Sequence, residues 1–277
     1  MLTRELDHIR PICFRGASKA WVLCRTVRKC LFYRVTTAPE GGVSGVPAQE
    51  NNEVTRWAPG SLLAQLSAAQ QQIVRGLGQP RQYHTGDALL SQGDPSQFVV
   101  IIIDGYVKIT AVTGDGAESL LAIRTAGDIV GEQAAMDLLP RSATARAADA
   151  VLGRVVTKQE FDRCLHDHPD IAQALNRAIS AKLRLSTQRR LEFRRDTKAR
   201  LAQVLAELYY GSPGRRRDGN MAVLVTQAEL AGLIGASEPA VHKAIRALRD
   251  AGAIGTGYGR LVIHDIEVVR EIAEGRA

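Results

Sequence analysis

The pattern of apolar and polar positions predicts a β-rich domain after residue 60. Between residues 62 and 77 the apolar positions approximate helical spacing. The pattern then changes to short apolar runs, rich in β-branched residues and separated by turns that contain glycine. Regular short strands with such turns are typical of an antiparallel sandwich or barrel. The expected strands are 98–103, 106–112 and 120–123, with a closing strand at 145–156.

A long amphipathic helix is predicted to follow this domain. Pro169 and Asp170 open it, and its apolar stripe steps by one helical turn through Ile171, Leu175, Ile179 and Leu183. Two such stripes can bury each other as a parallel coiled coil, so the pattern predicts a homodimer. Ser186 and Thr187 then interrupt the stripe. Burying polar side chains between paired helices costs free energy unless they have hydrogen-bond partners. The pair is therefore a candidate for a functional contact.

The C-terminal part has the pattern of a helix-turn-helix with a wing. A helix over 199–208 and a strand over 221–225 precede Thr226 and Glu229, which are spaced as a capping box. The helix that they begin ends at Gly235, and Ser237 caps a second helix that runs to about residue 250. A short hairpin over 251–263 is expected to form the wing.

Charge and composition change the picture at the N-terminus. The first 57 residues are rich in Arg and Lys and are broken by Pro and Gly, so we expect little stable structure there. The net charge of +7 favours a polyanionic partner, because cations placed against phosphates release counterions. The sequence contains neither an apolar run near the roughly 20 residues of a membrane helix nor a secretion signal. We therefore expect a cytoplasmic protein with no membrane partner.

A candidate phosphate-binding segment lies inside the β-rich domain. Gly131-Glu132-Gln133-Ala134-Ala135 is followed by Leu139-Pro140-Arg141-Ser142-Ala143-Thr144. A planar guanidinium can meet the two free oxygens of a cyclic phosphodiester with paired hydrogen bonds, and a carboxylate can accept from a ribose 2′-hydroxyl. The glycine and the small residues leave room for a ligand and expose backbone amides. The segment therefore predicts a cyclic nucleotide site.

This segment resembles the phosphate-binding cassette of the cyclic-nucleotide-binding domain family. The resemblance implies that Glu132 holds the ribose and Arg141 the cyclic phosphate, with Ser142 assisting. From about residue 60 to 265, the order of elements resembles the catabolite-activator (Crp/Fnr) family. In that family two adjacent hydroxyl residues of the dimer helix reach the adenine amino group, one from each subunit, which implies this role for Ser186 and Thr187. The full set of ligand-binding residues is Gly131, Glu132, Gln133, Ala134, Arg141, Ser142, Ala143, Leu183, Ser186 and Thr187.

The resemblance implies an α+β fold and a domain order. We expect an antiparallel β-roll of the cyclic-nucleotide-binding jelly-roll type, a long dimerisation helix and a winged helix-turn-helix. The expected boundaries are a basic, disordered extension at 1–57, the β-roll at 58–168, the dimerisation helix at 169–195 and the DNA-binding domain at 196–277. Cyclic AMP is the expected ligand. Cyclic GMP stays open, because the Ser142 hydroxyl could also serve a guanine amino group.

The second helix of the reading module departs from the family pattern. Well-known members place an Arg-Glu pair at its start, whereas this chain has Glu238 and Pro239 there. Glu238 can accept from a cytosine amino group but cannot donate to guanine, so the usual operator sequence is not assumed. The candidate DNA-binding residues are Glu238, His242 and Lys243 on bases, Thr226, Arg246 and Arg260 on phosphates, and the cap Ser237.

The function expected from these features is a homodimeric, cyclic-AMP-responsive transcription regulator. Its partners would be a double-stranded DNA operator and RNA polymerase. An enzyme is not expected, because no histidine accompanies a nucleophile or metal-ligand motif. One alternative is an iron-sulfur redox sensor that uses Cys13, Cys24, Cys30 and Cys164, and another is an architectural DNA-binding protein that is insensitive to cyclic AMP. Neither a metal nor a catalytic residue belongs to the preferred interpretation.

Overall fold

The computed structural model describes residues 57–112, 114, 116–212, 220–257 and 259–276, together with the backbone of β1 (Trp21–Val22) and β2 (Tyr33–Arg34). The chain divides into two compact units, Met1–Asn51 and Asn52–Ala277. In the first unit β1 and β2 pair antiparallel, and the rest of the predicted disordered extension up to residue 56 lies outside the described residues. The β-roll, the long helix and the winged helix all belong to the second unit.

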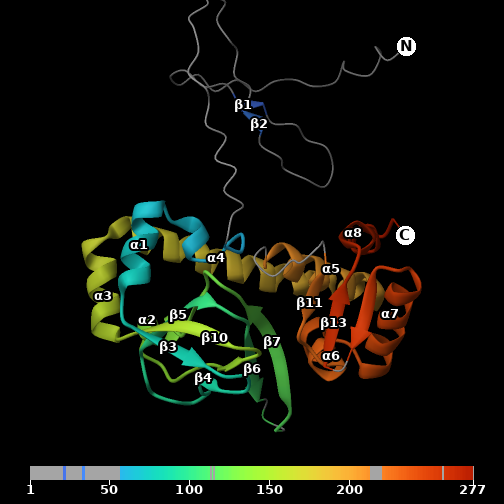
Figure 1. The fold of residues 1–277 in the computed structure, drawn as a ribbon, viewed down its shortest axis with the longest axis horizontal. Coiled ribbons are helices and arrows are strands. Elements are labelled where there is room, and N and C mark those ends of the chain that lie inside the picture. Colours follow the sequence, from blue (N-terminus) through green and yellow to red (C-terminus); the bar gives the residue numbers. More distant parts are fainter. Residues whose placement is uncertain are drawn as a thin grey trace, which may run out of the picture. The chain divides into compact units, whose positions relative to one another are not determined.

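Eight strands of the second unit form the predicted β-roll (Figure 1). They make two four-stranded antiparallel sheets with the strand orders β3-β10-β5-β8 and β4-β9-β6-β7. The buried faces of both sheets are built from β-branched and leucine side chains, as the apolar runs predict. The strands are β3 (Gln79–Tyr83), β4 (Ala88–Leu90), β5 (Val99–Asp104), β6 (Val107–Val112), β7 (Glu118–Arg124), β8 (Ile129–Val130), β9 (Thr144–Ala147) and β10 (Val151–Val156).

The closing strand predicted over 145–156 is two strands, so that prediction was wrong. β9 belongs to one sheet and β10 to the other, and the chain crosses between them at 148–150. The crossing is fixed on Tyr106, whose carbonyl accepts from the Ala148 amide at 2.8 Å while its own amide donates to Asp149 Oδ1 at 2.8 Å. A segment rich in alanine and valine therefore concealed a change of sheet.

The helix predicted over 62–77 is also interrupted. A short 3-10 turn, η1 (Leu63–Gln65), precedes α1 (Ala68–Gly76). Ser67 separates them, because its side chain and that of Gln70 form a capping box that starts a new helix. Two further helices of the roll, α2 (Glu132–Asp137) and α3 (Lys158–Asp167), were not predicted from the sequence.

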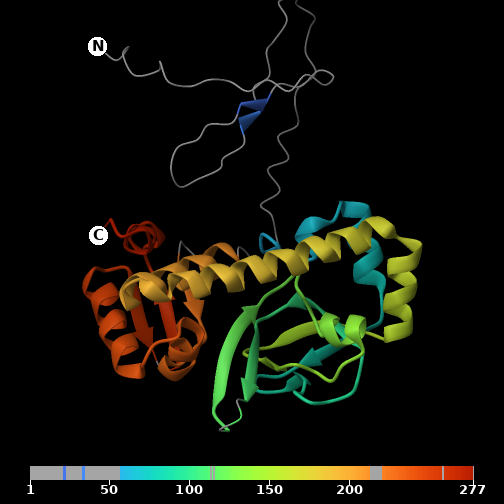
Figure 2. The same ribbon diagram turned by 180° about the vertical axis from the view of Figure 1, so that it is seen from behind.

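The long helix is present as α4 (Pro169–Leu191), followed by the 3-10 turn η2 (Glu192–Arg194) (Figure 2). Its first half is buried through Ile171, Ala174, Leu175 and Ala178, which join one apolar cluster with Leu63, Val99 and Ile101 of the roll. Its second half has a different environment. Leu183 and Leu191 are 67% and 74% exposed, so the second half of α4 leaves two leucine side chains uncovered.

The C-terminal part is the predicted winged helix-turn-helix. The reading helices α6 (Gln227–Ile234) and α7 (Glu238–Asp250) are joined at Gly235, which has the left-handed conformation with φ 60°. Helix α5 (Thr197–Tyr210) and an unpredicted helix α8 (Ile266–Glu274) pack with them around one apolar cluster. The small sheet has the order β11-β13-β12, formed by β11 (Met221–Val223), β12 (Ile254–Gly257) and β13 (Arg260–Ile263).

The β-roll and the winged helix touch along β6, β7 and α6. Tyr106 and Leu120 of the roll belong to the same buried cluster as the helices of the winged domain. Lys108 Nζ lies 2.7 Å from Glu229 Oε1, which joins β6 to the first turn of α6. At Gly232 an added Cβ would lie 3.2 Å from the backbone nitrogen of Leu120, so α6 approaches β7 closely.

Candidate functional site

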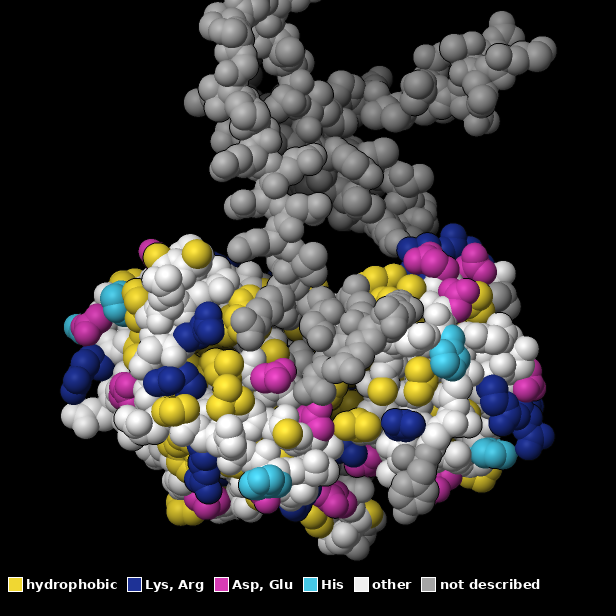
Figure 3. Space-filling model, viewed as in Figure 1, with side chains coloured by type: hydrophobic (Ala, Val, Ile, Leu, Met, Phe, Trp, Pro, Cys, Tyr) yellow, Lys and Arg dark blue, Asp and Glu magenta, His cyan; other side chains and the backbone are white. Residues whose placement is uncertain are grey.

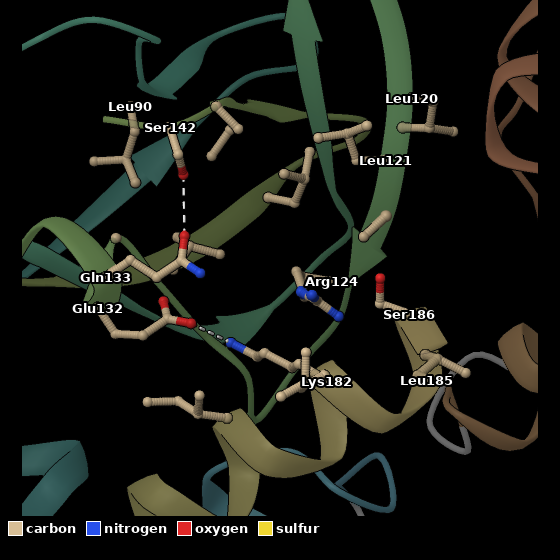
Figure 4. A pocket seen from close by; sticks show the side chains of 18 of the residues that line it. Leu90, Leu120, Leu121, Arg124, Glu132, Gln133, Ser142, Lys182, Leu185 and Ser186 are labelled. Carbon is tan, nitrogen blue, oxygen red and sulfur yellow. Dashed lines mark hydrogen bonds and ion pairs between the residues drawn. The ribbon is translucent and has the colours of Figure 1, made fainter. Parts of the chain in front are cut away.

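A cavity of about 630 Å³ lies between the β-roll and α4 (Figure 4). Its size is in the range of small-molecule sites. The roll supplies walls from β4, β6 to β9, helix α2 and the segment before β9, and the second half of α4 lies opposite. Phe193 of η2 and Gly232 and Leu233 of α6 also line the cavity. Of the ten ligand-binding residues predicted from the sequence, nine line it: Gly131, Glu132, Gln133, Ala134, Arg141, Ser142, Ala143, Leu183 and Ser186.

Gly131 fits its position only as glycine. It has φ 85°, a conformation that side chains with a Cβ rarely adopt. A Cβ there would lie 2.7 Å from Arg141 Nη1 and 3.1 Å from the carbonyl oxygen of Phe98. Because Gly131 has no side chain, the Arg141 guanidinium can reach the backbone at the start of α2.

Arg141 is held beneath this turn by backbone carbonyls. Its Nη1 donates to the Gly131 carbonyl at 2.8 Å, and its Nη2 donates to the Phe98 carbonyl at 2.6 Å and to Ser96 Oγ at 3.3 Å. The guanidinium also lies over the Phe98 ring, 5.0 Å from its centroid. Burial lowers the pKa of Arg141, while the charges of Asp94 and Glu132 oppose that shift. The side chain is 4% exposed and remains a fixed cation at the cavity wall.

Glu132 is paired with a residue that sequence reasoning missed. Lys182 Nζ lies 2.8 Å from Glu132 Oε1 and donates to the Ile129 carbonyl at 2.7 Å. Figure 4 shows this pair joining α4 to α2 across the cavity. Lys182 precedes Ser186 by four residues and therefore lies on the same helix face. That spacing was the signal that could have found it.

Ser142 and Gln133 meet on the opposite side of the cavity from α4. The Ser142 hydroxyl donates to Gln133 Oε1 at 3.0 Å, as drawn in Figure 4. Both side chains are solvent-exposed and line the cavity. They are therefore free to exchange their mutual hydrogen bond for bonds to a ligand.

The predicted ligand-binding residues of α4 do not all face the cavity. Leu183 and Ser186 line the cavity. Thr187 is not among its lining residues, and its hydroxyl donates to the Leu183 carbonyl at 3.0 Å. Because adjacent residues of a helix point about 100° apart, the Thr187 side chain is directed away from this cavity.

The predicted DNA-binding residues lie on the surface of the winged helix. Glu238, His242, Lys243 and Arg246 are exposed on α7, whereas Val241, Ala244, Ile245 and Leu248 face the core. Figure 3 shows Lys and Arg side chains gathered over α7. Ser237 caps α7, Thr226 caps α6 within the predicted capping box, and Arg260 is exposed on β13. The exposed face of α7 thus presents mixed charge to a partner.

Comparisons with known proteins agree with this architecture. Residues 80–168 match the family model of the cyclic nucleotide-binding domain, and residues 199–272 match that of the Crp-like helix-turn-helix domain. The CRP-like cAMP-activated global transcriptional regulator of Mycobacterium tuberculosis is 30% identical over 192 residues, which are 68% of this chain and 85% of the relative. The chain belongs to the Crp/Fnr family of transcription regulators.

Two solved structures share the fold. A CRP/FNR family transcriptional regulator from Thermus thermophilus aligns with a TM-score of 0.58 and 27% identity, over 72% of this chain and 100% of that one. FixK2 from Bradyrhizobium japonicum aligns with a TM-score of 0.61 and 19% identity, over 71% of this chain and 97% of that one. The second likeness concerns the fold alone. As a member of this family, the chain is a transcription regulator with a cyclic nucleotide-binding domain and a DNA-binding domain.

Two structural findings concern a membrane-spanning helix and a metal site. Among the described helices, none is both long enough and apolar enough to span a bilayer. The described residues contain no group of three or more His, Cys, Asp or Glu side chains placed to hold a metal ion. Cys13, Cys24 and Cys30, on which the iron-sulfur hypothesis depends, lie outside the described residues, and Cys164 is buried in α3.

Proposed function

We propose that this Crp/Fnr protein is a homodimeric transcription regulator whose DNA binding responds to a cyclic purine mononucleotide. The observation that carries the proposal is the meeting of Arg141, Glu132 and Ser186 on one cavity, although they come from three separate segments of the chain. Cyclic AMP is the ligand expected from the sequence, and the Mycobacterium relative is named for activation by it.

The phosphate end of the ligand would lie at Arg141 and Ser142. Arg141 supplies a positive charge that stays fixed because backbone carbonyls hold its guanidinium. Ser142 supplies a hydroxyl whose present partner, Gln133, is easily exchanged for a phosphate oxygen. Glu132 would accept from the ribose 2′-hydroxyl while it keeps its bond to Lys182, because a carboxylate has several acceptor sites.

The second half of α4 would pair with the same segment of another copy. Leu183 and Leu191 are exposed apolar residues on a helix whose first half is already covered by the roll. A parallel pairing of two such helices buries this stripe. The hydroxyl of Thr187, directed away from its own cavity, would then face the ligand of the partner subunit, as the family resemblance implies.

The regulatory mechanism follows from where the ligand lies. A nucleotide that touches both the roll and α4 binds most tightly to one arrangement of the two, and it shifts the population toward that arrangement. The exposed face of α7 would then be presented with the spacing that adjacent major grooves of an operator require. RNA polymerase would be the downstream partner.

The proposal is tested by calorimetry with cyclic AMP and cyclic GMP on the wild type and on Arg141→Ala. Saturable binding that is lost in the variant, with dimer mass and far-ultraviolet circular dichroism unchanged, supports it. Arg81→Ala is the matched control, because that guanidinium lies over Tyr83 and does not line the cavity. Absence of saturable binding of either nucleotide by the wild type refutes the proposal and favours an architectural DNA-binding protein.

A further inference from the structure

The cavity contains a cation whose side chain has no partner among the residues that the structure describes. Arg124, the last residue of β7, is partly buried and lines the cavity. No hydrogen bond, ion pair or ring contact joins its side chain to another described residue. Its neighbour Thr125, by contrast, donates to the Gly211 carbonyl at 3.0 Å. The donors of the Arg124 guanidinium are therefore available to a ligand in the cavity.

The other inward cations of the cavity are all engaged. Lys182 is held by Glu132, Arg141 by the carbonyls of Gly131 and Phe98, and Arg189 by Glu207 at 2.9 Å. Arg190 also lines the cavity, but it is exposed to solvent. Glu132 is the single carboxylate among the described lining residues. That carboxylate is paired with Lys182 and not with Arg124, so a ligand is left to supply an acceptor for Arg124.

Arg124 lies in the part of the cavity where a base is expected. Figure 4 shows its guanidinium directed into the cavity, in the part lined by Lys182 and Ser186 of α4. Ser142 and Gln133, where the cyclic phosphate is expected, lie on the other side of the same view. A ligand with its phosphate at Ser142 would therefore present its base, rather than its phosphate, to Arg124.

We infer that Arg124 reads the purine base and makes the pocket selective for a 6-oxopurine, so that cyclic GMP binds more tightly than cyclic AMP. This inference rests on the proposed function, since it places the nucleotide in the same cavity. A guanidinium only donates hydrogen bonds. Guanine presents O6 and N7 as adjacent acceptors that a guanidinium can meet with two parallel bonds, whereas adenine presents a donor amino group beside N7.

The size of the preference follows from the loss of one bidentate contact. Such a contact discriminates against the wrong base by on the order of ten- to a hundredfold in affinity. Adenine would leave one donor of Arg124 facing the adenine amino group without an acceptor.

The Ser142 hydroxyl offers a different origin of guanine selectivity, through a hydrogen bond to the 2-amino group. A third nucleotide can distinguish this origin from a contact of Arg124 with O6 and N7.

The experiment measures the affinities of cyclic AMP, cyclic GMP and cyclic IMP for the full-length protein by calorimetry. Cyclic IMP has the O6 and N7 acceptors of guanine but lacks the 2-amino group. We expect cyclic IMP to bind as cyclic GMP does, and both to bind at least tenfold more tightly than cyclic AMP. In Arg124→Leu the affinities for cyclic GMP and cyclic IMP should fall to that for cyclic AMP, which itself should change less than threefold.

The matched control is Arg81→Leu, which removes the same charge outside the cavity, where the guanidinium lies over the Tyr83 ring. It should leave the order of the three affinities unchanged. Equal binding of all three nucleotides by the wild type, or an unaltered preference in Arg124→Leu, overturns the inference but leaves the proposed function intact. A cyclic IMP affinity that matches cyclic AMP assigns selectivity to the 2-amino group and also overturns it. Failure of all three to bind is instead a failure of the proposed function.

Discussion

Lys182 Nζ lies 2.8 Å from Glu132 Oε1, which ties the long helix α4 to the start of the phosphate-binding cassette. Both side chains are largely buried, with 14% and 9% of their surfaces exposed. The ammonium also holds the Ile129 carbonyl, so it connects α4 to the strand as well as to the helix of the cassette. Removal of the Lys182 ammonium should therefore lower the free energy of unfolding.

Lys182→Met should lower the free energy of unfolding by about 2 kcal/mol, because it leaves Glu132 as a charge in a largely buried site without its partner. Urea unfolding without nucleotide measures this. The control is Lys158→Met, which removes an i,i+4 pair with the 52% exposed Asp162 and should change stability by less than about 0.5 kcal/mol. Similar effects of the two substitutions would show that the pair in the cavity contributes no more than a surface ion pair.

Gly131→Ala should destabilise the protein and also abolish nucleotide binding. The left-handed backbone costs an alanine about 1 kcal/mol, and the added Cβ would collide with the guanidinium of Arg141. Gly86→Ala separates the two effects, because Gly86 has φ 92° but nothing within 4 Å of its added Cβ. Thermal unfolding and calorimetry should show a comparable backbone penalty in both variants, with binding retained only in Gly86→Ala. Normal binding by Gly131→Ala would contradict the close approach seen here.

Lys243→Ala should weaken binding to the specific operator by about tenfold or more while changing binding to random DNA much less. Lys243 is exposed on α7, next to His242 and on the opposite face from Val241. A base contact carries sequence discrimination, whereas a phosphate contact does not. Footprinting titrations on selected and random DNA measure both. Arg270→Ala, on α8 and paired with Glu267, serves as the charge control, and an equal loss on both DNAs would make Lys243 a phosphate contact.

Cys164 should react slowly with iodoacetamide in the folded protein. Burial raises the pKa of its thiol, and the charges of Asp167 and Glu160 raise it further, so the reactive thiolate is scarce at neutral pH. Since the folded state holds the proton more tightly than the unfolded state, the thiol supports stability at neutral pH, and this contribution is lost as the pH rises through the elevated pKa. Mass spectrometry of timed labelling in buffer and in urea measures the difference. Rapid labelling in buffer would show that the thiol is accessible in the folded protein. The iron-sulfur alternative is tested separately, by a visible absorbance spectrum of anaerobically purified protein.

The sequence predicted those parts of the site that are local in the chain. The cassette and the α4 stripe each lie within one short segment, so their spacing, together with the family resemblance, predicted a ligand site that includes both. Arg124 was missed because an isolated cation at a strand end looks like any surface residue until the fold brings it into a cavity. Lys182 was missed although it precedes Ser186 by four residues on the same helix face. The change of sheet between β9 and β10 escaped for a related reason, since the bonds that fix it involve Tyr106, about forty residues earlier in the chain.

The carboxylate of Glu229 serves two purposes at once. Its Oε2 accepts from the Thr226 amide at 2.7 Å and so closes the cap of α6, while its Oε1 meets Lys108 of the β-roll at 2.7 Å. Separation of α6 from β6 would therefore break the bond to Lys108 but leave the cap intact, because the cap lies within the helix itself. The lysine and glutamate are 18% and 26% exposed, so dissolved ions can compete for them. High ionic strength should consequently weaken this ion pair, whereas the apolar contact of Tyr106 and Leu120 with the winged helix should persist.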